Sequence, residues 1–356
     1  MISDRPRPRV PQGRRFGGSV PSRRRQRGVA LLIAILLVAF GTIIAAAMAY
    51  DNAMTARRAA ATFEFDQALL VAEGAESVAA YGLQLTAKSN PSYTGAGQPW
   101  STPLPPSEVT PGVTLEASLE DLQGRFNINN LVMTDGNTPN TAAIAAFQRL
   151  LTSLNLQPKL ADLIVDWIDK NTDPMDDGAE DSVYMEMDPP YRTPNLPITS
   201  TSELLALPGM TRAEFDTLAP YIVALPLGVQ INTCDAKSLV LDALTGHQQW
   251  SNLSPQEFKQ DRTASGGCFP TPAEVIQAAG ESTTGAVGGG QAGTSTSSPT
   301  GSNVQQSISG MLTEKSNWFR LTSYVTLGTA EFSVYTLLYQ DQTGMVRPEL
   351  RSFTPD

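Results

Sequence analysis

The sequence predicts an α+β fold with a large inserted all-α subdomain, preceded by one long apolar helix. Three observations lead to this prediction. The run of residues 29–50 contains 22 residues and no charged side chain. Short segments that alternate apolar and polar residues, typical of strands, lie before residue 135 and after residue 226. Residues 140–225 instead carry apolar side chains at helical spacing.

The charge of the chain is divided sharply along its length. Residues 1–28 hold nine arginines and one acid, whereas residues 29–356 carry a net charge of about −18. A basic tail beside an apolar run is typical of a cytoplasmic flank, so we expect the acidic remainder in the periplasm. At 1.5 Å per residue the run forms about 33 Å of helix, enough to cross a hydrocarbon core of about 30 Å. A secretory signal cleaved near Met48 is the alternative, although such signals have only about 7–15 apolar residues.

The helical pattern continues beyond the membrane run. Residues 51–88 are rich in alanine, lack proline and repeat apolar side chains at helical spacing. Asn90 and Pro91 predict the end of this helix. The Pro-, Gly- and Ser-rich residues 89–112 predict a connector.

The later segments fall into an α+β domain over 108–135 and 226–350, with the inserted subdomain over 140–225. Residues 280–307 are rich in Gly, Ser, Thr and Gln, so we expect a mobile loop there. In order, the expected elements are a strand at 113–119, helices at 141–155, 159–169, 202–207 and 212–224, a strand at 229–232, helices at 236–245 and 271–279, and a hairpin of strands at 318–327 and 331–339.

Cys234 and Cys268 are the only two cysteines of the sequence. In an oxidising compartment an isolated, even pair predicts one disulfide. On the chain-entropy model, closing a loop of about 35 residues stabilises the fold by roughly 3–4 kcal/mol. A zinc site is disfavoured because no CxxC motif occurs and the single histidine, His247, has no neighbouring thiol in the sequence.

The acidic stretch 166–188 is the strongest candidate for a ligand site. It contains neither His nor Cys, so its possible ligands are hard oxygens, which favour Ca²⁺ over zinc. So many carboxylates repel one another, and a bound cation would relieve that repulsion. A solvated acidic loop is the alternative, and Pro174 disfavours a true EF-hand because it stands where the turn glycine belongs. The preferred ligands are Asp173, Asp177, Glu180, Asp181 and Asp188.

Catalysis and nucleic-acid binding have little support. The sequence has one histidine and no GxSxG, HExxH or P-loop motif, which leaves a Ca²⁺-dependent hydrolase with paired carboxylates as a remote alternative. The segment 207–211, Leu-Pro-Gly-Met-Thr, resembles a helix-hairpin-helix turn, which can hold DNA phosphates. The exported part is acidic and would repel phosphate, so we interpret this turn as a packing hairpin.

The junction between the basic tail and the apolar run resembles a type III signal, the class cut by prepilin peptidase. Arg23-Arg-Arg-Gln-Arg-Gly28 precedes Val29-Ala-Leu-Leu-Ile33. This resemblance implies cleavage after Gly28 and methylation of the new N-terminus at Val29. Most such subunits have Glu five residues after the cut, where this chain has Ile33. One class that lacks this Glu is the K-type minor pseudopilin of the type II secretion system.

Further motifs resemble the same family, general secretion pathway protein K, in the same order and from residue 23 to about residue 340. The resemblance implies a pilin-like fold, in which the long helix packs on a small antiparallel sheet, and Ca²⁺ binding in the helical subdomain. The motifs are Phe65-Asp-Gln-Ala, Gly74-Ala-Glu-Ser, Asp121-Leu-Gln-Gly-Arg-Phe-Asn-Ile-Asn129, Asp166-Trp-Ile-Asp169, Asp177-Gly-Ala-Glu-Asp181, Pro189-Pro-Tyr-Arg-Thr-Pro-Asn195 and Glu203-Leu-Leu-Ala-Leu-Pro-Gly-Met210.

The resemblance implies a non-enzymatic, single-pass inner-membrane protein with a cytoplasmic N-terminus. A buried Glu costs at least about 2.5–3.5 kcal/mol in hydrocarbon unless it is paired, so a subunit with Ile33 needs no neighbour above it. We therefore expect a tip subunit that helps to initiate, caps and limits a short pseudopilus for the export of folded proteins. The implied partners are the I- and J-type minor pseudopilins, the major pseudopilin, prepilin peptidase and the inner-membrane assembly platform, with no nucleic acid. A tip subunit of a type IV pilus-like machine, used in adhesion or DNA uptake, is the alternative.

Overall fold

The structure, a computed structural model, describes residues 27–281 and 305–354. The arginine-rich tail over residues 1–26 and the segment 282–304 of the expected mobile loop lie outside the described residues. The chain divides into two compact units, Met1–Phe63 and Glu64–Asp356.

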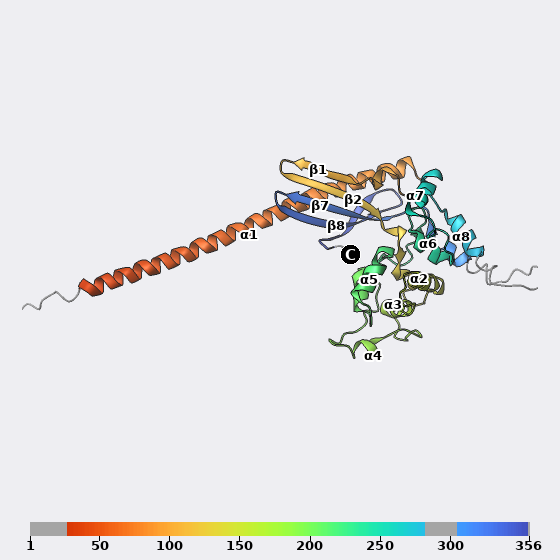
Figure 1. Cartoon of the computed structure of the whole chain (residues 1–356), viewed down its shortest axis with the longest axis horizontal. Helices are drawn as coiled ribbons and strands as arrows, with labels where there is room; N and C mark the ends of the chain where they lie inside the picture. Colours follow the sequence, from red (N-terminus) through yellow and green to blue (C-terminus); the bar gives the residue numbers. More distant parts are fainter. Residues whose placement is uncertain (1–26, 282–304, 355–356) are drawn as a thin grey trace, which may run out of the picture. The chain divides into compact units, whose positions relative to one another are not determined.

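Helix α1 spans Arg27–Ser89 and contributes residues to both units (Figure 1). It contains no proline and is rich in alanine and leucine, which are strong helix formers. The helix ends before Pro91, which lacks an amide proton and disfavours helical geometry in the residue before it. Among the described residues, α1 is the one helix long and apolar enough to cross a membrane, and residues 29–50 are exposed along their whole length.

In the second unit, the last part of α1 packs on a five-stranded antiparallel sheet of order β1-β2-β7-β8-β9 (Figure 1). The strands are β1 (Leu104–Thr110), β2 (Val113–Asp121), β7 (Trp318–Leu327), β8 (Ala330–Gln340) and β9 (Val346–Ser352). Their side chains alternate between the two faces, and the inner face joins α1 in one apolar core. This core includes Ala68, Ala72, Ala75, Leu83, Leu115, Phe319, Val325, Val334 and Leu338.

The hairpin expected near the C-terminus is present as β7 and β8. The two strands pair from Leu327 with Ala330 to Trp318 with Tyr339. Gly328 follows β7 with a φ of +59°, in the left-handed region that favours glycine, so the chain reverses within two residues.

The expectation of a connector over the whole of 89–112 is wrong, because β1 occupies its second half. Pro105 and Pro106 hide the strand pattern in the sequence. They are tolerated because β1 lies at the edge of the sheet, where a missing amide proton breaks no ladder. The register shifts between Leu104 and Ser107, the stretch that contains both prolines.

The helical segment begins after β3 (Phe126–Asn127) and ends at β4 (Ile222–Val223), which pair in parallel. The helix expected over 212–224 is wrong at its end and stops at Leu218, because Pro220 cannot donate a helical hydrogen bond. The elements between the two strands are η4 (Ile128–Leu131), α2 (Thr141–Ser153), α3 (Leu160–Ile168), α4 (Asp181–Tyr184), η5 (Thr201–Ala206), α5 (Arg212–Leu218) and η6 (Ala219–Tyr221).

We call the elements between β3 and β4, together with the helices that share their apolar core, the helical body. Its core extends past residue 225. Helices α6 (Ser238–Thr245) and α8 (Pro272–Glu281), together with Trp250, pack into the same apolar core as α2 and α3. The polar helix α7 was not expected, since it lacks apolar periodicity and is marked only by a capping box of Ser254 with Glu257. The remaining elements are η2 (Pro99–Ser101), η3 (Leu122–Gly124), β5 (Ile231–Asn232), β6 (Leu312–Thr313) and α7 (Pro255–Ala264).

A buried ion pair joins α1 to the last strand. Glu76 is 6% exposed and accepts hydrogen bonds from Arg351 Nε at 2.7 Å, Arg351 Nη2 at 2.8 Å and Thr336 Oγ1 at 2.8 Å. All three donors converge on one carboxylate, which satisfies its charge inside the core. This contact fixes β9 to the face of α1 that packs on the sheet.

Candidate functional site

The junction that resembles a type III signal lies in the first turn of α1. The helix begins at Arg27, so Gly28 and Val29 have helical backbone. Val29 and Ile33 are both exposed, at 58% and 52%. Whether this bond is cut and the new amine methylated stays a prediction.

The five expected ligands do not gather at one point. Asp173, Asp177 and Asp188 are exposed, whereas Asp181 is half-buried and Glu180 is buried. Asp181 accepts hydrogen bonds from Arg192 Nη1 and from the Thr193 backbone amide, each at 3.1 Å. Within residues 27–281 and 305–354, no three His, Cys, Asp or Glu side chains lie close enough together to hold a metal ion.

Helix α3 instead buries carboxylates that the sequence interpretation did not select. Asp162 and Asp166 are four residues apart on one face of the helix, and Asp169 is the residue that ends it. Asp166 and Asp169 are 0% and 1% exposed, and Glu180 from the following loop is 5% exposed. Three carboxylates thus lie inside the helical body without a cationic partner in any described ion pair.

Burial makes the charged forms of these groups unfavourable. It raises the pKa of Asp166 to about 6, with a further contribution from the neighbouring Asp169 carboxylate. It also raises the pKa of Asp169 to about 6. The pKa of Glu180 rises to about 7, first through burial and then through repulsion by Asp166 and Asp169.

Several oxygens around these carboxylates have no hydrogen-bond partner. Asp169 Oδ1, Glu180 Oε1 and Asn195 Oδ1 are buried and unpartnered. The amide group of Asn195 is held in place, because its Nδ2 donates to Asn171 O at 3.0 Å. Such hard oxygens are the ligand type that Ca²⁺ prefers, but the three carboxylates do not lie close enough together in this structure to hold an ion.

Gly178 leaves room for the Asp166 carboxylate. A Cβ atom at Gly178 would lie 1.8 Å from Asp166 Oδ2, so no other residue fits there unless Asp166 moves. The rings of Trp167 and Tyr184, both buried in the helical body, pack together with their centroids 5.3 Å apart. The spacing of acids on the apolar helix α3 is the sequence signal that could have identified Asp166 and Asp169.

The disulfide expected between Cys234 and Cys268 is present. It lies beside a buried polar network, in which Asp121 accepts hydrogen bonds from Gln123 N at 2.8 Å, Asn232 Nδ2 at 2.8 Å and Ser316 Oγ at 2.5 Å. Burial and then repulsion by Asp235 raise the pKa of Asp121. The disulfide and this network together join the sheet to the loop that carries α7.

The turn at Leu207–Thr211 packs against the helical core. Leu207 and Met210 are 2% and 9% exposed, and Thr211 caps α5 through a reciprocal pair of hydrogen bonds with Glu214. The turn therefore has the features of the packing hairpin expected from the sequence.

Comparisons with known proteins agree on one family. A family model described as type II secretion system (T2SS), protein K, matches residues 124–227. The chain is 34% identical over 251 residues to the type II secretion system protein K of Klebsiella pneumoniae, covering 68% of this chain and 77% of that protein. It is also 34% identical over 280 residues to protein K of Aeromonas hydrophila, covering 72% and 84%.

A solved structure shares the fold. One chain of the crystal structure of the GspK-GspI-GspJ complex from the enterotoxigenic Escherichia coli type 2 secretion system matches with a TM-score of 0.66. The match covers 84% of this chain and 100% of that chain, at 21% sequence identity. The expected pilin-like α+β architecture with a helical insertion is therefore confirmed.

Proposed function

The chain belongs to the type II secretion system protein K family, and from this premise we propose that it occupies the tip of the pseudopilus, where it helps to start assembly, caps the filament and limits its length. Protein K is a minor pseudopilin, a structural component of the secretion system rather than an enzyme. Membership of the family does not by itself establish the tip position. We infer that position from the residues of the membrane span.

The absence of an acidic side chain from the span is the observation that carries the proposal. Residues 29–50 contain no Asp or Glu, and Ile33 stands five residues after Gly28. A subunit with a carboxylate in hydrocarbon needs a cationic neighbour, since the unpaired charge costs at least about 2.5–3.5 kcal/mol. Ile33 creates no such requirement, which suits the last subunit of a filament.

The helical body supports the capping role. Helices α2, α3, α6 and α8 form their own apolar core, separate from the core between α1 and the sheet. This second body adds bulk that a subunit made of α1 and the sheet alone does not have. Steric exclusion by this body would stop further subunits from adding above the tip.

The proposal includes the processing and orientation that the N-terminus implies. Prepilin peptidase would remove residues 1–28 and methylate Val29. The nine arginines favour a cytoplasmic N-terminus, and the acidic remainder then faces the periplasm. The proposed partners are the I- and J-type minor pseudopilins, the major pseudopilin and the inner-membrane assembly platform. The complex named with the solved structure supports the first two of these partners.

A structural Ca²⁺ ion in the helical body is also part of the proposal. We favour Asp166, Asp169, Glu180 and Asn195 as ligands, because three of these residues have an unpartnered buried oxygen. Binding would require the three carboxylates to move closer together, since no three of the described acidic side chains are close enough to hold an ion. The ion would supply the positive charge that these carboxylates lack. Asp173, Asp177, Asp181 and Asp188, expected from the sequence, form the alternative ligand set, and the first, second and last of them are exposed.

A single substitution in the span tests the tip position. With the major pseudopilin overproduced, the Ile33→Glu variant should let filaments extend past this subunit, so pseudopili lengthen and the variant is found along the shaft. Ile33→Gln is the matched control, because it is polar but carries no charge to attract a neighbour's amine. Immunogold labelling with length measurement reads out both properties.

Two results would contradict the proposal. If filaments that contain the Ile33→Glu variant keep their length and carry the variant only at one end, the missing carboxylate at position 33 does not determine the tip position. A mature protein from native membranes whose N-terminus differs from methylated Val29 would remove the processing on which assembly depends.

A further inference from the structure

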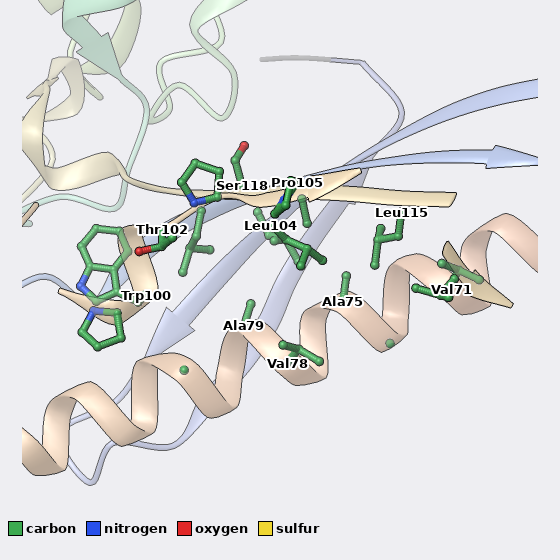
Figure 2. A pocket seen from close by; sticks show the side chains of 18 of the residues that line it. Val71, Ala75, Val78, Ala79, Trp100, Thr102, Leu104, Pro105, Leu115 and Ser118 are labelled. Carbon is green, nitrogen blue, oxygen red and sulfur yellow. The ribbon is translucent and has the colours of Figure 1, made fainter. Parts of the chain in front are cut away.

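Two cavities of the second unit differ in their chemistry. A groove of about 780 Å³, between α1 and the first hairpin of the sheet, has no charged side chain in its lining (Figure 2). A smaller cleft of about 30 Å³ lies between the sheet and the helical body, and Arg125 and Arg320 both line it. We call this the arginine cleft. Its volume is enough for a water molecule or one small ion.

The cleft has one wall from the sheet and one from the helical body. Arg320, Leu337 and Leu350 lie opposite one another on β7, β8 and β9 and line the first wall. The residues next to them in β7 and β8 pack on α1, so these side chains are on the opposite face of the sheet. Thr201 and Val223 line the second wall. Charged and apolar side chains of the sheet therefore meet a hydroxyl group of the helical body.

Two largely buried positive charges in the cleft share one carboxylate. Arg125 Nη2 and Arg320 Nη2 donate to the two oxygens of Glu120, the second at 2.7 Å. The arginine side chains are 14% and 18% exposed, and Glu120 is their one partner among the described ion pairs. Arginine keeps its charge in proteins. One positive charge is therefore left over after pairing.

The same arginines have donors without acceptors. Arg125 Nε and Arg320 Nε are buried, and no described residue accepts a hydrogen bond from either. A buried N–H group without an acceptor destabilises a fold, and more so when the group is charged. Water accepts such hydrogen bonds but supplies no negative charge. An anion supplies both the acceptors and the charge.

Lys237 adds to the positive charge beside these arginines. Burial lowers the pKa of Lys237, and the charge of Arg125 lowers it further. Lys237 belongs to none of the ion pairs in the described part of the chain. The acids that interact with it are Glu120 and Asp235, and Asp235 has Arg262 as its strongest cationic neighbour. With Asp235 balanced by Arg262, three cations share the Glu120 carboxylate.

We propose that the arginine cleft binds a small oxyanion between Arg125 and Arg320, of the class that includes phosphate, sulfate and free carboxylates. Guanidinium groups bind such anions through paired, charge-assisted hydrogen bonds, because their planar fork matches two oxygens at once. The anion also has an oxygen left to accept from a hydroxyl group of the second wall, such as that of Thr201. Because Arg320 belongs to the sheet and Thr201 to the helical body, the bound anion links the two. Binding there does not require the tip position proposed above.

Titration calorimetry with inorganic phosphate, sulfate and acetate tests the cleft, with the full-length chain in detergent and a buffer free of other oxyanions. Arg320→Gln should weaken binding at least about tenfold, because it removes charge-assisted hydrogen bonds. Arg347→Gln is the matched control. It removes the same charge from the same sheet, but Arg347 is 64% exposed and outside the cleft lining. This control should change the affinity less than about twofold.

The comparison of the two variants also removes the contribution of the arginines in residues 1–28, which both variants retain. Equal affinities in Arg320→Gln and Arg347→Gln would overturn the proposal. The absence of saturable binding of all three anions by the unsubstituted chain would show that water satisfies the guanidinium groups, and would overturn it as well.

A crystallographic measurement does not depend on how well a variant folds. Crystals of the unsubstituted chain soaked in selenate should give an anomalous peak within hydrogen-bond distance of both the Arg125 and the Arg320 guanidinium groups. A peak found elsewhere on the surface, with none in the cleft, would identify an adventitious ion only and would contradict the proposal.

Discussion

Removing the guanidinium of Arg351 should weaken the attachment of α1 to the sheet. In Arg351→Ala the Glu76 carboxylate, 6% exposed, keeps only its hydrogen bond from Thr336 Oγ1 at 2.8 Å. Breaking a buried pair from one side costs about 3–5 kcal/mol. The Arg351 side chain is 39% exposed, so water offsets part of this loss and we expect about 2–3 kcal/mol. At about 2–4 °C per kcal/mol, the unfolding midpoint should fall by roughly 5–10 °C.

The same strand provides a matched control. Arg347 pairs with Glu349 at 2.7 Å, but these side chains are 64% and 36% exposed. Surface pairs of this kind contribute about 0–1 kcal/mol, so Arg347→Ala should lower the midpoint by at most a few degrees. Thermal unfolding of both variants in detergent, followed by circular dichroism, gives the comparison. Midpoints that fall equally in the two variants would refute the argument that Glu76 is stranded as a buried charge.

Three further outcomes follow from the same structure. Burial raises the pKa of Asp121, so stability should fall as the pH rises from about 4 to about 7; urea unfolding in EDTA checks this, and Asp121→Asn should flatten the slope. Ca²⁺ should raise the unfolding midpoint of the unsubstituted chain and of Asp173→Asn but not of Asp166→Asn, whereas the reverse pattern would favour the exposed ligand set. Replacing Cys234 and Cys268 together by serine should cost roughly 3–4 kcal/mol; urea unfolding measures this loss, and an unchanged midpoint would remove the disulfide as a source of stability.

Features that depend on short-range pattern could be predicted from the sequence. The long apolar helix follows from 22 uncharged residues, and the β7–β8 hairpin from alternation around Gly328. The pairing of Cys234 with Cys268 followed from their number alone. In each case the local pattern and the tertiary structure favour the same conformation.

Features that depend on distant neighbours could not be predicted in this way. Strand β1 has two prolines, and only its place at the sheet edge makes them acceptable. Which acids of 166–188 are buried is decided by the packing of the helical body, and the local sequence does not contain that information. Asp166 stands between Val165 and Trp167 on a helix whose only other charged residue is Asp162, and this apolar setting is a usable signal for a buried carboxylate.

The prolines of the sheet also bear on how the protein can associate. Both edge strands contain them, Pro105 and Pro106 in β1 and Pro348 in β9, and the register shifts near each group. Interrupted edges resist the addition of a foreign strand, which otherwise leads to open-ended aggregation. The sheet edges of this protein are thus poorly suited to polymerisation, which leaves its helices as the surfaces available for contacts between subunits.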